Sequence, residues 1–369
     1  MRRSAAHSRP AAGRQATSHD VAQRAGVSQS AVSRAFTHGA SIAAATRKKV
    51  MAAASALDYR PNQVARALIS ERSGLVGLVI PPDFIPLYSL AIGEFARRLP
   101  TRGLQPLVLA AVASTCADDL VEKFIEYRVD GVILTAATLS SRVAARCAQR
   151  GIPVIQFGRA ELRARGARVS SDKLGGGRTA ARLLRACGAR HAAYLGGDPD
   201  TSTDRDRAAG FAREWPGAPK VSAGKFAYAE GEVAARALLR LKPRPDAVFC
   251  ASDVLAYALL DVARHEFNLS IPRSLMVKGV DDAPPSAWQG YALSTMRQDV
   301  PHLVAQTVDL LVERIAVAGA RARLRPTDQT SSIPKQARWP KTAFSPLTSA
   351  ACRARRKWWT SCSPKTQVP

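Results

Sequence analysis

Apolar residues near the start of the chain follow a helical spacing that is interrupted once. Residues 20–25 place their apolar side chains on one helical face, and Gly26 breaks this pattern. The pattern resumes after Ser28, a good helix N-cap, with Val32 and Phe36 facing inward. Two short helices joined by a tight turn are typical of a helix-turn-helix unit, whose second helix enters the major groove of DNA.

A third helix is predicted over residues 46–57, where apolar residues recur at helical spacing and charges lie on the opposite side. This predicted helix ends within residues 58–61, because Pro61 disfavours a helical conformation in the residue before it. Asn62 can cap a further short helix reaching Leu68. That piece is too short to be stable alone in water, so we expect its folding to depend on a partner.

From Gly74 onward, buried-strand patterns alternate with amphipathic-helix patterns, which indicates parallel sheets with crossover helices. In the first of these helices, Leu90, Ala91, Phe95 and Leu99 are expected to face inward. Ligands in such folds bind at the carboxyl ends of the strands. The predicted strands are 74–80, 106–112, 131–137, 153–157, 192–197, 247–252 and 275–280, and the predicted helices are 87–98, 117–127, 140–150, 175–187, 207–214, 231–241 and 254–267.

The net charge of +25 is concentrated at the two ends of the chain. Residues 1–72 hold twelve Lys and Arg against three acids, and residues 319–369 hold eleven against one. A cation-rich first segment suits a DNA backbone, because binding there releases counterions. Residues 1–16 carry no acid and lack the apolar core of a secretion signal, so we interpret them as a disordered basic arm rather than a transit peptide.

Two further features of the composition bear on location. Polar and proline residues at 81–83 interrupt the best apolar run, so no membrane span is predicted, and a cytoplasmic location is expected. The six cysteines have no C-x-x-C spacing and are expected to be reduced, mostly buried thiols.

Three linked motifs resemble those of the LacI/GalR family of bacterial transcriptional regulators. D-V-A-x-x-A-G-V-S-x-x-x-V-S-R begins at Asp20, T-R-x-x-V at Thr46, and Y-R-P-N-x-x-A-x-x-L at Tyr59. Weaker matches continue to about residue 318, such as D-K-L-G-G from Asp172 and G-V-D-D from Gly279. The resemblance implies an α/β protein with a small all-α helix-turn-helix head and a periplasmic-binding-protein-like body of two Rossmann-like subdomains.

This organisation divides the chain into five segments. We expect the basic arm at 1–16, the helix-turn-helix domain at 17–60, a hinge helix at 61–72, the effector-binding and dimerisation body at 73–319, and an atypical basic tail at 320–369. The tail lacks helical or strand periodicity, and the family would place the last strand of the second subdomain there. Either a shifted reading frame or a genuine divergent extension accounts for it.

The predicted recognition helix and hinge supply the candidate DNA contacts. Arg34 is the best candidate for base reading, because the two donors of its guanidinium group match the acceptors on the edge of guanine. The alternative is that Arg34 contacts a phosphate. The resemblance adds Gln29 and Ser30 as base readers, although Ser30 is equally well explained as an ordinary surface residue. It also implies that Leu68 wedges into the minor groove beside the small Ala65, unless Leu68 packs against the body. Phosphate contacts are implied for Thr17, Ser28, Ser33, Tyr59 and Asn62, where Ser28 could be only a cap.

The body supplies candidate effector contacts. Arg207 and Asp281 match family positions that hold a polar effector, and Asp253 follows a predicted strand. An interdomain salt bridge is the alternative for these charged residues. Ser252 stands where the family often has Asn, which leaves the class of ligand open, and Phe84 could line an apolar wall or belong to the core.

Catalytic signatures are absent from the sequence. There is no H-x-x-x-H pair, G-x-S-x-G turn or G-K-[ST] loop, so no enzyme activity, metal or cofactor is expected. The sequence predicts a homodimeric, sequence-specific regulator, with repression as the expected mode. Its partners would be a near-palindromic double-stranded DNA operator and a small-molecule effector such as a sugar, with no membrane partner. Two alternatives stay open: a damaged paralogue that binds DNA but ignores ligands, and a small-molecule binding module without a DNA function.

Overall fold

The structure, a computed structural model, divides into two compact units, residues 1–73 and 74–369. The residues that the structure describes are 16–36, 40–60, 72–81, 85–110, 117–135, 140–158 and 167–323.

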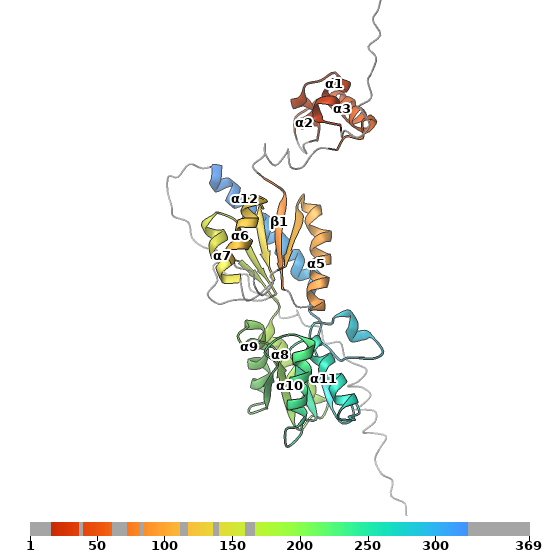
Figure 1. Cartoon of the computed structure of the whole chain (residues 1–369), viewed down its shortest axis with the longest axis vertical. Coiled ribbons are helices and arrows are strands. Elements are labelled where there is room, and N and C mark those ends of the chain that lie inside the picture. The colour runs from red at the N-terminus through yellow and green to blue at the C-terminus, as the bar shows by residue number, and fades with distance from the viewer. Residues whose placement is uncertain are drawn as a thin grey trace, which may run out of the picture. The chain divides into compact units, whose positions relative to one another are not determined.

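The first unit contains the predicted helical head, with α1 (Ser18–Ala25), α2 (Gln29–Phe36) and α3 (Ala44–Ala56) (Figure 1). Thr17 and Asp20 form a reciprocal capping box at the start of α1. Gly26 ends α1 with a φ of 65°, a left-handed conformation that favours glycine. The core of the head is formed by buried Val21, Ala22, Val32, Ala35, Val50, Ala53 and Ala54.

The second unit begins with a five-stranded parallel sheet of strand order β2-β1-β3-β4-β5. Helices α6 and α7 cover one face of this sheet, and α5 and α12 cover the other (Figure 1). The strands are β1 (Leu75–Ile80), β2 (Gln105–Ala110), β3 (Gly131–Leu134), β4 (Val154–Phe157) and β5 (Ala167–Val169). The helices are α5 (Pro86–Arg98), the 3-10 turn η1 (Leu99–Arg102), α6 (Ala117–Glu126), α7 (Ser140–Gln149) and α12 (Val300–Arg323).

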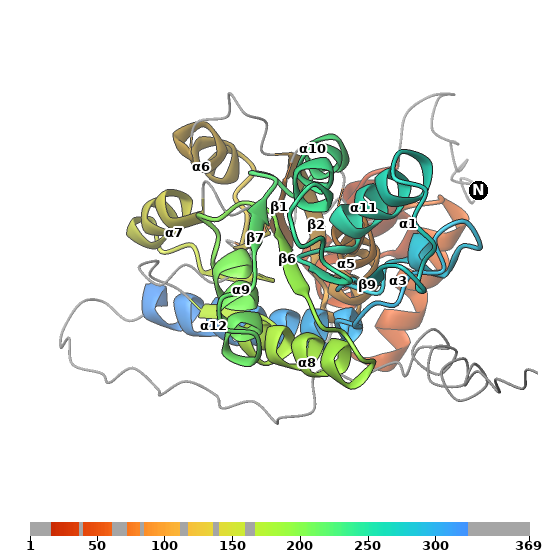
Figure 2. The same cartoon turned by 90° about the horizontal axis from the view of Figure 1, so that it is seen from below.

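A second parallel sheet in the same unit has the order β7-β6-β8-β9. Helices α8 and α9 lie on one side of it, and α10 and α11 lie on the other (Figure 2). The strands are β6 (Ala192–Gly196), β7 (Lys220–Ser222), β8 (Ala247–Cys250) and β9 (Met276–Lys278). The helices are α8 (Lys173–Ala186), α9 (Ser202–Glu214), α10 (Tyr228–Leu239), α11 (Asp253–His265) and the 3-10 turn η2 (Pro284–Ala287). The predicted α/β body with parallel sheets is therefore confirmed.

Some predictions about elements were incomplete or wrong. Strands β5 and β7 and the final helix α12 were not among the predicted elements. Leu90, predicted to face inward, is 39% exposed, because the neighbouring Ala91 and Phe95 take the buried face of α5. Helix α12 continues to Arg323, four residues into the segment assigned to the tail.

Two glycines allow α8 and α9 to cross with their backbones in contact. A Cβ on Gly177 would collide with the carbonyl oxygen of Arg207, and a Cβ on Gly210 would collide with that of Leu174. Only a residue without a side chain permits so close an approach. The crossing brings the start of α8 next to the middle of α9, which places Lys173 and Arg207 in one neighbourhood.

The cysteines are only partly in the reduced state that the sequence predicts. Cys147 and Cys250 are free and buried, as predicted, but Cys187 is disulfide-bonded. The expectation of reduced thiols is therefore wrong at Cys187, because the spacing of cysteines along the chain does not show which of them form disulfides. Within the described residues, no helix is long and apolar enough to cross a membrane, and no cluster of side chains could hold a metal ion.

Candidate functional site

The candidate reading surface of the head is the outer side of α2. Ser28 caps this helix, because its Oγ accepts a hydrogen bond from the backbone N–H of Ala31 at 3.2 Å. The capping alternative for Ser28 is thus observed, and its predicted phosphate contact stays a prediction. Val32 and Ala35 are buried in the core of the head. They fix the face of α2 that points away from solvent.

The three predicted base readers lie on the exposed face of α2, together with Ser33. The Gln29 side chain is already oriented, since its Nε2 donates to the Oγ of Ser18 at 2.8 Å. The Nε of Arg34 lies 3.4 Å from the carbonyl oxygen of Ser30, a long contact within the helix. All four side chains are therefore accessible to a nucleic acid.

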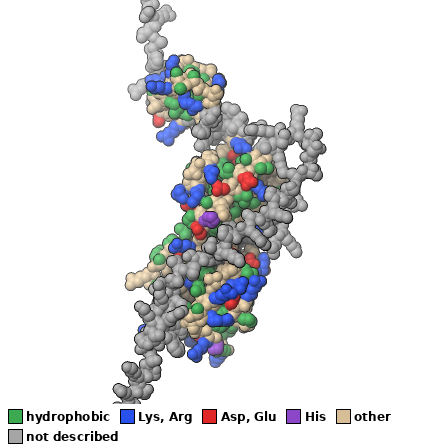
Figure 3. Space-filling view, turned by 180° about the vertical axis from the view of Figure 1, so that it is seen from behind, with side chains coloured by type: hydrophobic (Ala, Val, Ile, Leu, Met, Phe, Trp, Pro, Cys, Tyr) green, Lys and Arg blue, Asp and Glu red, His purple; other side chains and the backbone are tan. Residues whose placement is uncertain are grey.

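The other residues predicted to contact DNA lie outside α2. Thr17 caps α1, and Tyr59 packs edge-on against Phe36 with ring centroids 5.8 Å apart. Asn62, Ala65 and Leu68 lie outside the described residues. Residues 16–60 hold six Lys and Arg against two acids. Lys and Arg side chains appear at several places on the visible face of the head, in keeping with a phosphate-binding surface (Figure 3).

In the body, the candidate effector residues gather where the chain passes between the two sheets. The chain leaves the first sheet after β5 and enters α8 at Lys173. It returns through residues 294–298, which run parallel to the end of β9 and the residues after it. The bridges Lys278–Ser294 and Asp281–Arg297 join the two segments. These two crossing segments meet through side chains.

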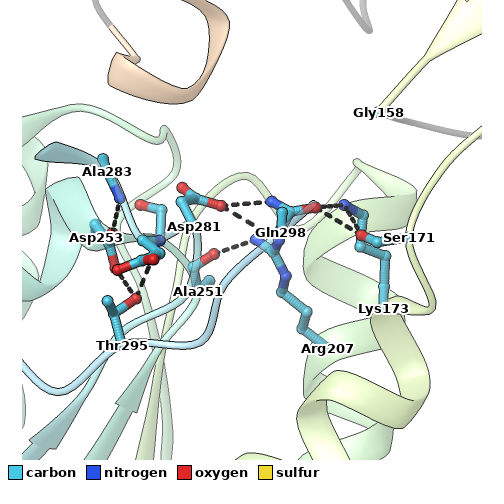
Figure 4. Close-up of polar contacts among 12 residues, drawn as sticks. Gly158, Ser171, Lys173, Arg207, Ala251, Asp253, Asp281, Ala283, Thr295 and Gln298 are labelled. Carbon is cyan, nitrogen blue, oxygen red and sulfur yellow. Dashed lines mark hydrogen bonds and ion pairs between the residues drawn. The ribbon is translucent and has the colours of Figure 1, made fainter. Parts of the chain in front are cut away.

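Gln298 links the outgoing and returning segments (Figure 4). Its Oε1 accepts hydrogen bonds from Lys173 Nζ at 2.7 Å and from Ser171 Oγ at 2.6 Å. Its Nε2 donates to Asp281 Oδ1 at 2.6 Å. Arg207 lies 3.6 Å from the same Asp281 oxygen and also donates to the carbonyl oxygen of Ala251 (Figure 4). Both charges are about 95% buried, so this ion pair is shielded from solvent.

Asp253 forms a second cluster, whose function in this structure is to hold a loop. Its Oδ2 accepts from Ala283 N at 2.9 Å and Ser286 Oγ at 2.8 Å, and its Oδ1 accepts from Thr295 Oγ1 at 2.5 Å. The Ser286 hydroxyl also contacts Tyr257 Oη at 2.7 Å. Asp253 therefore fastens residues 279–295 to the start of α11, and its acceptor sites are largely occupied by the chain itself.

The backbone held in this way is strained. Asp281 has a φ of 140° and Asp282 a φ of 58°, both in a region that residues with side chains rarely adopt. Such conformations persist only where the surroundings enforce them, and they cluster at functional sites. The bonds from Asp253 and Gln298 supply that enforcement here.

Burial changes the protonation of these carboxyl groups. Burial raises the pKa of Asp253 to about 7, and the neighbouring Asp281 adds to the increase. Burial likewise raises the pKa of Asp281, while Arg207 and Lys173 oppose this change. On β9, burial lowers the pKa of Lys278 to about 8. The crossing region thus contains one acid, Asp253, and one base, Lys278, whose pKa values lie near neutral pH.

The sequence-predicted effector residues are only partly brought together. Arg207 and Asp281 form an ion pair with each other, and their contact with an effector stays a prediction. Asp253 is bonded to the loop that follows Asp281, and Ser252 caps α11 through Leu255 N at 3.3 Å. Phe84 lies outside the described residues. Lys173 and Gln298 were not predicted, because a lysine at a helix start and a glutamine after a loop look like surface residues unless the crossing topology is known.

The head has three helices, one of which exposes a reading face, as in DNA-binding regulators. The body has two parallel sheets and a buried polar cluster where the chain crosses between them, as in ligand-binding domains. Together these features define the class of DNA-binding regulators with a ligand-binding body. The comparisons with known proteins agree. Residues 17–62 match the bacterial regulatory proteins of the lacI family, and residues 169–336 match the periplasmic binding protein-like domain.

Relatives match over most of the chain. The HTH-type transcriptional regulator CelR of Thermobifida fusca is 30% identical over 82% of this chain and 92% of its own length. The sucrose operon repressor of Streptococcus mutans is 29% identical over 80% of this chain and 92% of its own length. Among solved structures, the lac repressor dimer bound to operator and the anti-inducer ONPF has a TM-score of 0.70 at 25% identity, covering 84% of this chain and 94% of that one. The chain belongs to the LacI family, and it is a DNA-binding transcriptional regulator controlled by an effector, as the sequence predicted.

Proposed function

We propose that the protein acts in the bacterial cytoplasm as a homodimeric repressor whose two heads bind the half-sites of a near-palindromic operator. The observation that carries this proposal is the outer face of α2, where Gln29, Ser30 and Arg34 are exposed on a helix whose other face is buried. Twofold symmetry in the protein requires matching half-sites, spaced by about one turn of DNA or a multiple of it. A head that reads bases in this way discriminates between sequences by about 1 to 3 kcal/mol per good contact.

The effector proposed for the body is a small polar molecule such as a sugar. Relatives named for sucrose and ribose operons, and a solved regulator in complex with cellobiose, support this class of ligand. Arg207 and Asp281 offer a donor fork and a carboxylate next to each other, a combination suited to hydroxyl groups.

We infer that the effector acts through the crossing segments. A ligand that binds Arg207 competes with Asp281 and the Ala251 carbonyl, and Gln298 connects this contact to both crossings. A ligand changes operator affinity only to the extent that it binds the two arrangements differently. Coupling of about 1 to 3 kcal/mol is sufficient for regulation.

The DNA function is tested by selecting operators from a random duplex library with the full-length protein, followed by footprinting. We expect an enriched near-palindrome and protection confined to it. Protection no different from that on random sequence would leave a small-molecule binding module as the better description of the chain.

The effector function is tested by thermal unfolding in the presence of sugars, nucleosides and organic acids. A ligand at one hundred times its Kd stabilises the folded protein by about 2.7 kcal/mol, a shift easily detected. The same compound must change operator affinity in a binding titration. Operator binding that no compound alters, in a protein that none stabilises, would instead support the effector-insensitive paralogue.

A further inference from the structure

The C-terminal end of the reading helix is held by a side chain from the next helix. Helix α2 ends at Phe36, and the last four carbonyl groups of a helix have no partner within it. Arg47, the fourth residue of α3, donates from Nη1 to the carbonyl oxygen of Ala35 at 2.7 Å. It also donates from Nη2 to the carbonyl oxygen of Ala40 at 3.3 Å. One guanidinium therefore joins the end of α2 to the segment leading into α3.

The environment of Arg47 differs from that of its charged neighbours. Lys48 and Lys49 are exposed, whereas Arg47 is partly buried against the carbonyl groups it binds. Its positive charge lies at the C-terminal end of α2, where the helix dipole favours a cation. The planar fork of arginine reaches two carbonyl groups at once, which the single ammonium of a lysine does not reproduce.

The reading helix has few other anchors. It has eight residues, and only Val32 and Ala35 are fully buried in the core of the head. Ser28 and the Gln29–Ser18 hydrogen bond hold its first turn, and Arg47 and the Phe36–Tyr59 ring contact hold its last. A small rotation of so short a helix would move the Gln29 and Arg34 side chains away from the bases they read.

We infer that Arg47 is a positioning residue for base reading, which sets the orientation of α2 from its C-terminal end and does not neutralise a DNA phosphate. This inference rests on the proposed DNA reading by α2. It distinguishes Arg47 from the other cations of the head, which a count of charges alone would assign to the DNA backbone.

The test compares Arg47→Lys, Arg47→Met and the control Lys48→Ala in the full-length protein. Binding to a selected operator and to a random duplex is measured by fluorescence anisotropy across a series of KCl concentrations. Because lysine keeps the charge and loses the fork, Arg47→Lys should weaken operator binding roughly tenfold while leaving random-duplex binding and its salt dependence unchanged. Arg47→Met should weaken operator binding at least as much, again with the wild-type salt dependence. Lys48→Ala, which removes an exposed charge, should leave the preference for operator over random duplex unchanged.

Two results would overturn the inference. The first is wild-type operator affinity in Arg47→Lys. The second is a reduction by about one in the slope of log affinity against log salt in Arg47→Met, because that is the mark of a lost phosphate contact.

A second measurement needs no DNA and keeps the test independent of the proposed function. Hydrogen exchange of the amides in residues 29–36 should be faster in Arg47→Lys than in the wild type, because the end of α2 has lost its cap. Unchanged exchange there would refute the positioning role. If the wild-type protein shows no operator preference, the proposed function fails, but the exchange rates still decide the role of Arg47.

Discussion

The bonds made by Asp253 lead to the sharpest prediction about the body. Asp253→Ala removes the acceptor for three buried donors: the backbone N–H of Ala283 at 2.9 Å, and the hydroxyls of Ser286 at 2.8 Å and Thr295 at 2.5 Å. The side chain of Asp253 is 1% exposed, so water cannot easily replace the carboxylate. The loop that follows the strained turn at Asp281 also loses these three bonds, while Gln298 still holds Asp281 itself.

The size of the effect follows from the kind of donor that is left unpaired. A buried donor without a partner costs about 1 to 3 kcal/mol. The Ser286 hydroxyl can turn toward Tyr257, but the Ala283 N–H is fixed by the backbone. We therefore expect Asp253→Ala to lower the free energy of unfolding of the body by about 3 kcal/mol, a large part of the stability of an ordinary domain.

The assay is urea unfolding followed by circular dichroism, with Ser252→Ala as the matched control. Ser252 is equally buried and one residue away, but it makes a single long cap bond of 3.3 Å to Leu255 N. Its loss should cost about 1 kcal/mol or less. If Asp253→Ala is no less stable than Ser252→Ala, the tethering argument is wrong.

The raised pKa of Asp253 adds a prediction about pH. The folded protein holds the proton up to about pH 7, whereas the unfolded chain releases it near the ordinary value of 3.8. The resulting contribution to stability is fully present below pH 3.8 and is lost as the pH rises to 7. Asp253→Asn mimics the protonated form, because its amide can donate to the Thr295 hydroxyl and accept from Ala283. Its stability relative to the wild type should therefore increase as the pH rises from about 4 to about 7, and parallel pH profiles for the two proteins would contradict this.

The remaining predictions concern the helix crossing and the DNA contacts. Gly210→Ala should destabilise the body by about 2 to 3 kcal/mol, because its Cβ meets the backbone of Leu174, whereas Gly93→Ala on α5, where space is open, should be neutral or stabilising in the same unfolding assay. Arg34→Lys should relax the base preference at one operator position by about 1 to 3 kcal/mol, as measured by titration of operators mutated one position at a time. Leu68→Ala should weaken operator binding and reduce DNA bending, and an unchanged bend angle in a phasing assay would contradict the wedge role.

The head could be predicted in detail because each of its features is local in sequence. A break at Gly26, a cap at Ser28 and apolar spacing through Val32 define the two helices without knowledge of the rest of the fold. The short strands β5 and β7 could not be found in this way. Each has three residues and little burial, so neighbouring strands rather than intrinsic pattern make them strands.

Helix α12 is a different case, because its signal was present in the sequence. Val304, Val308 and Leu311 recur every three or four residues and are all buried against the first sheet. The predicted elements end at residue 280, although the residues that form α12 have this helical spacing. Periodicity would therefore have been enough to predict α12.

The polar cluster at the crossings shows why sequence motifs identified only half of the site. Arg207 and Asp281 could be predicted one residue at a time, since the family resemblance implies an effector contact at each of these positions. Lys173 and Gln298 acquire their roles only because two glycines let α8 and α9 touch and because the return segment runs beside β9. Gln298 uses both ends of its amide, one toward Lys173 and one toward Asp281. A ligand that draws Asp281 away from Arg207 must therefore disturb a bond that reaches the outgoing segment, so occupancy of the body and the geometry of both crossings change together.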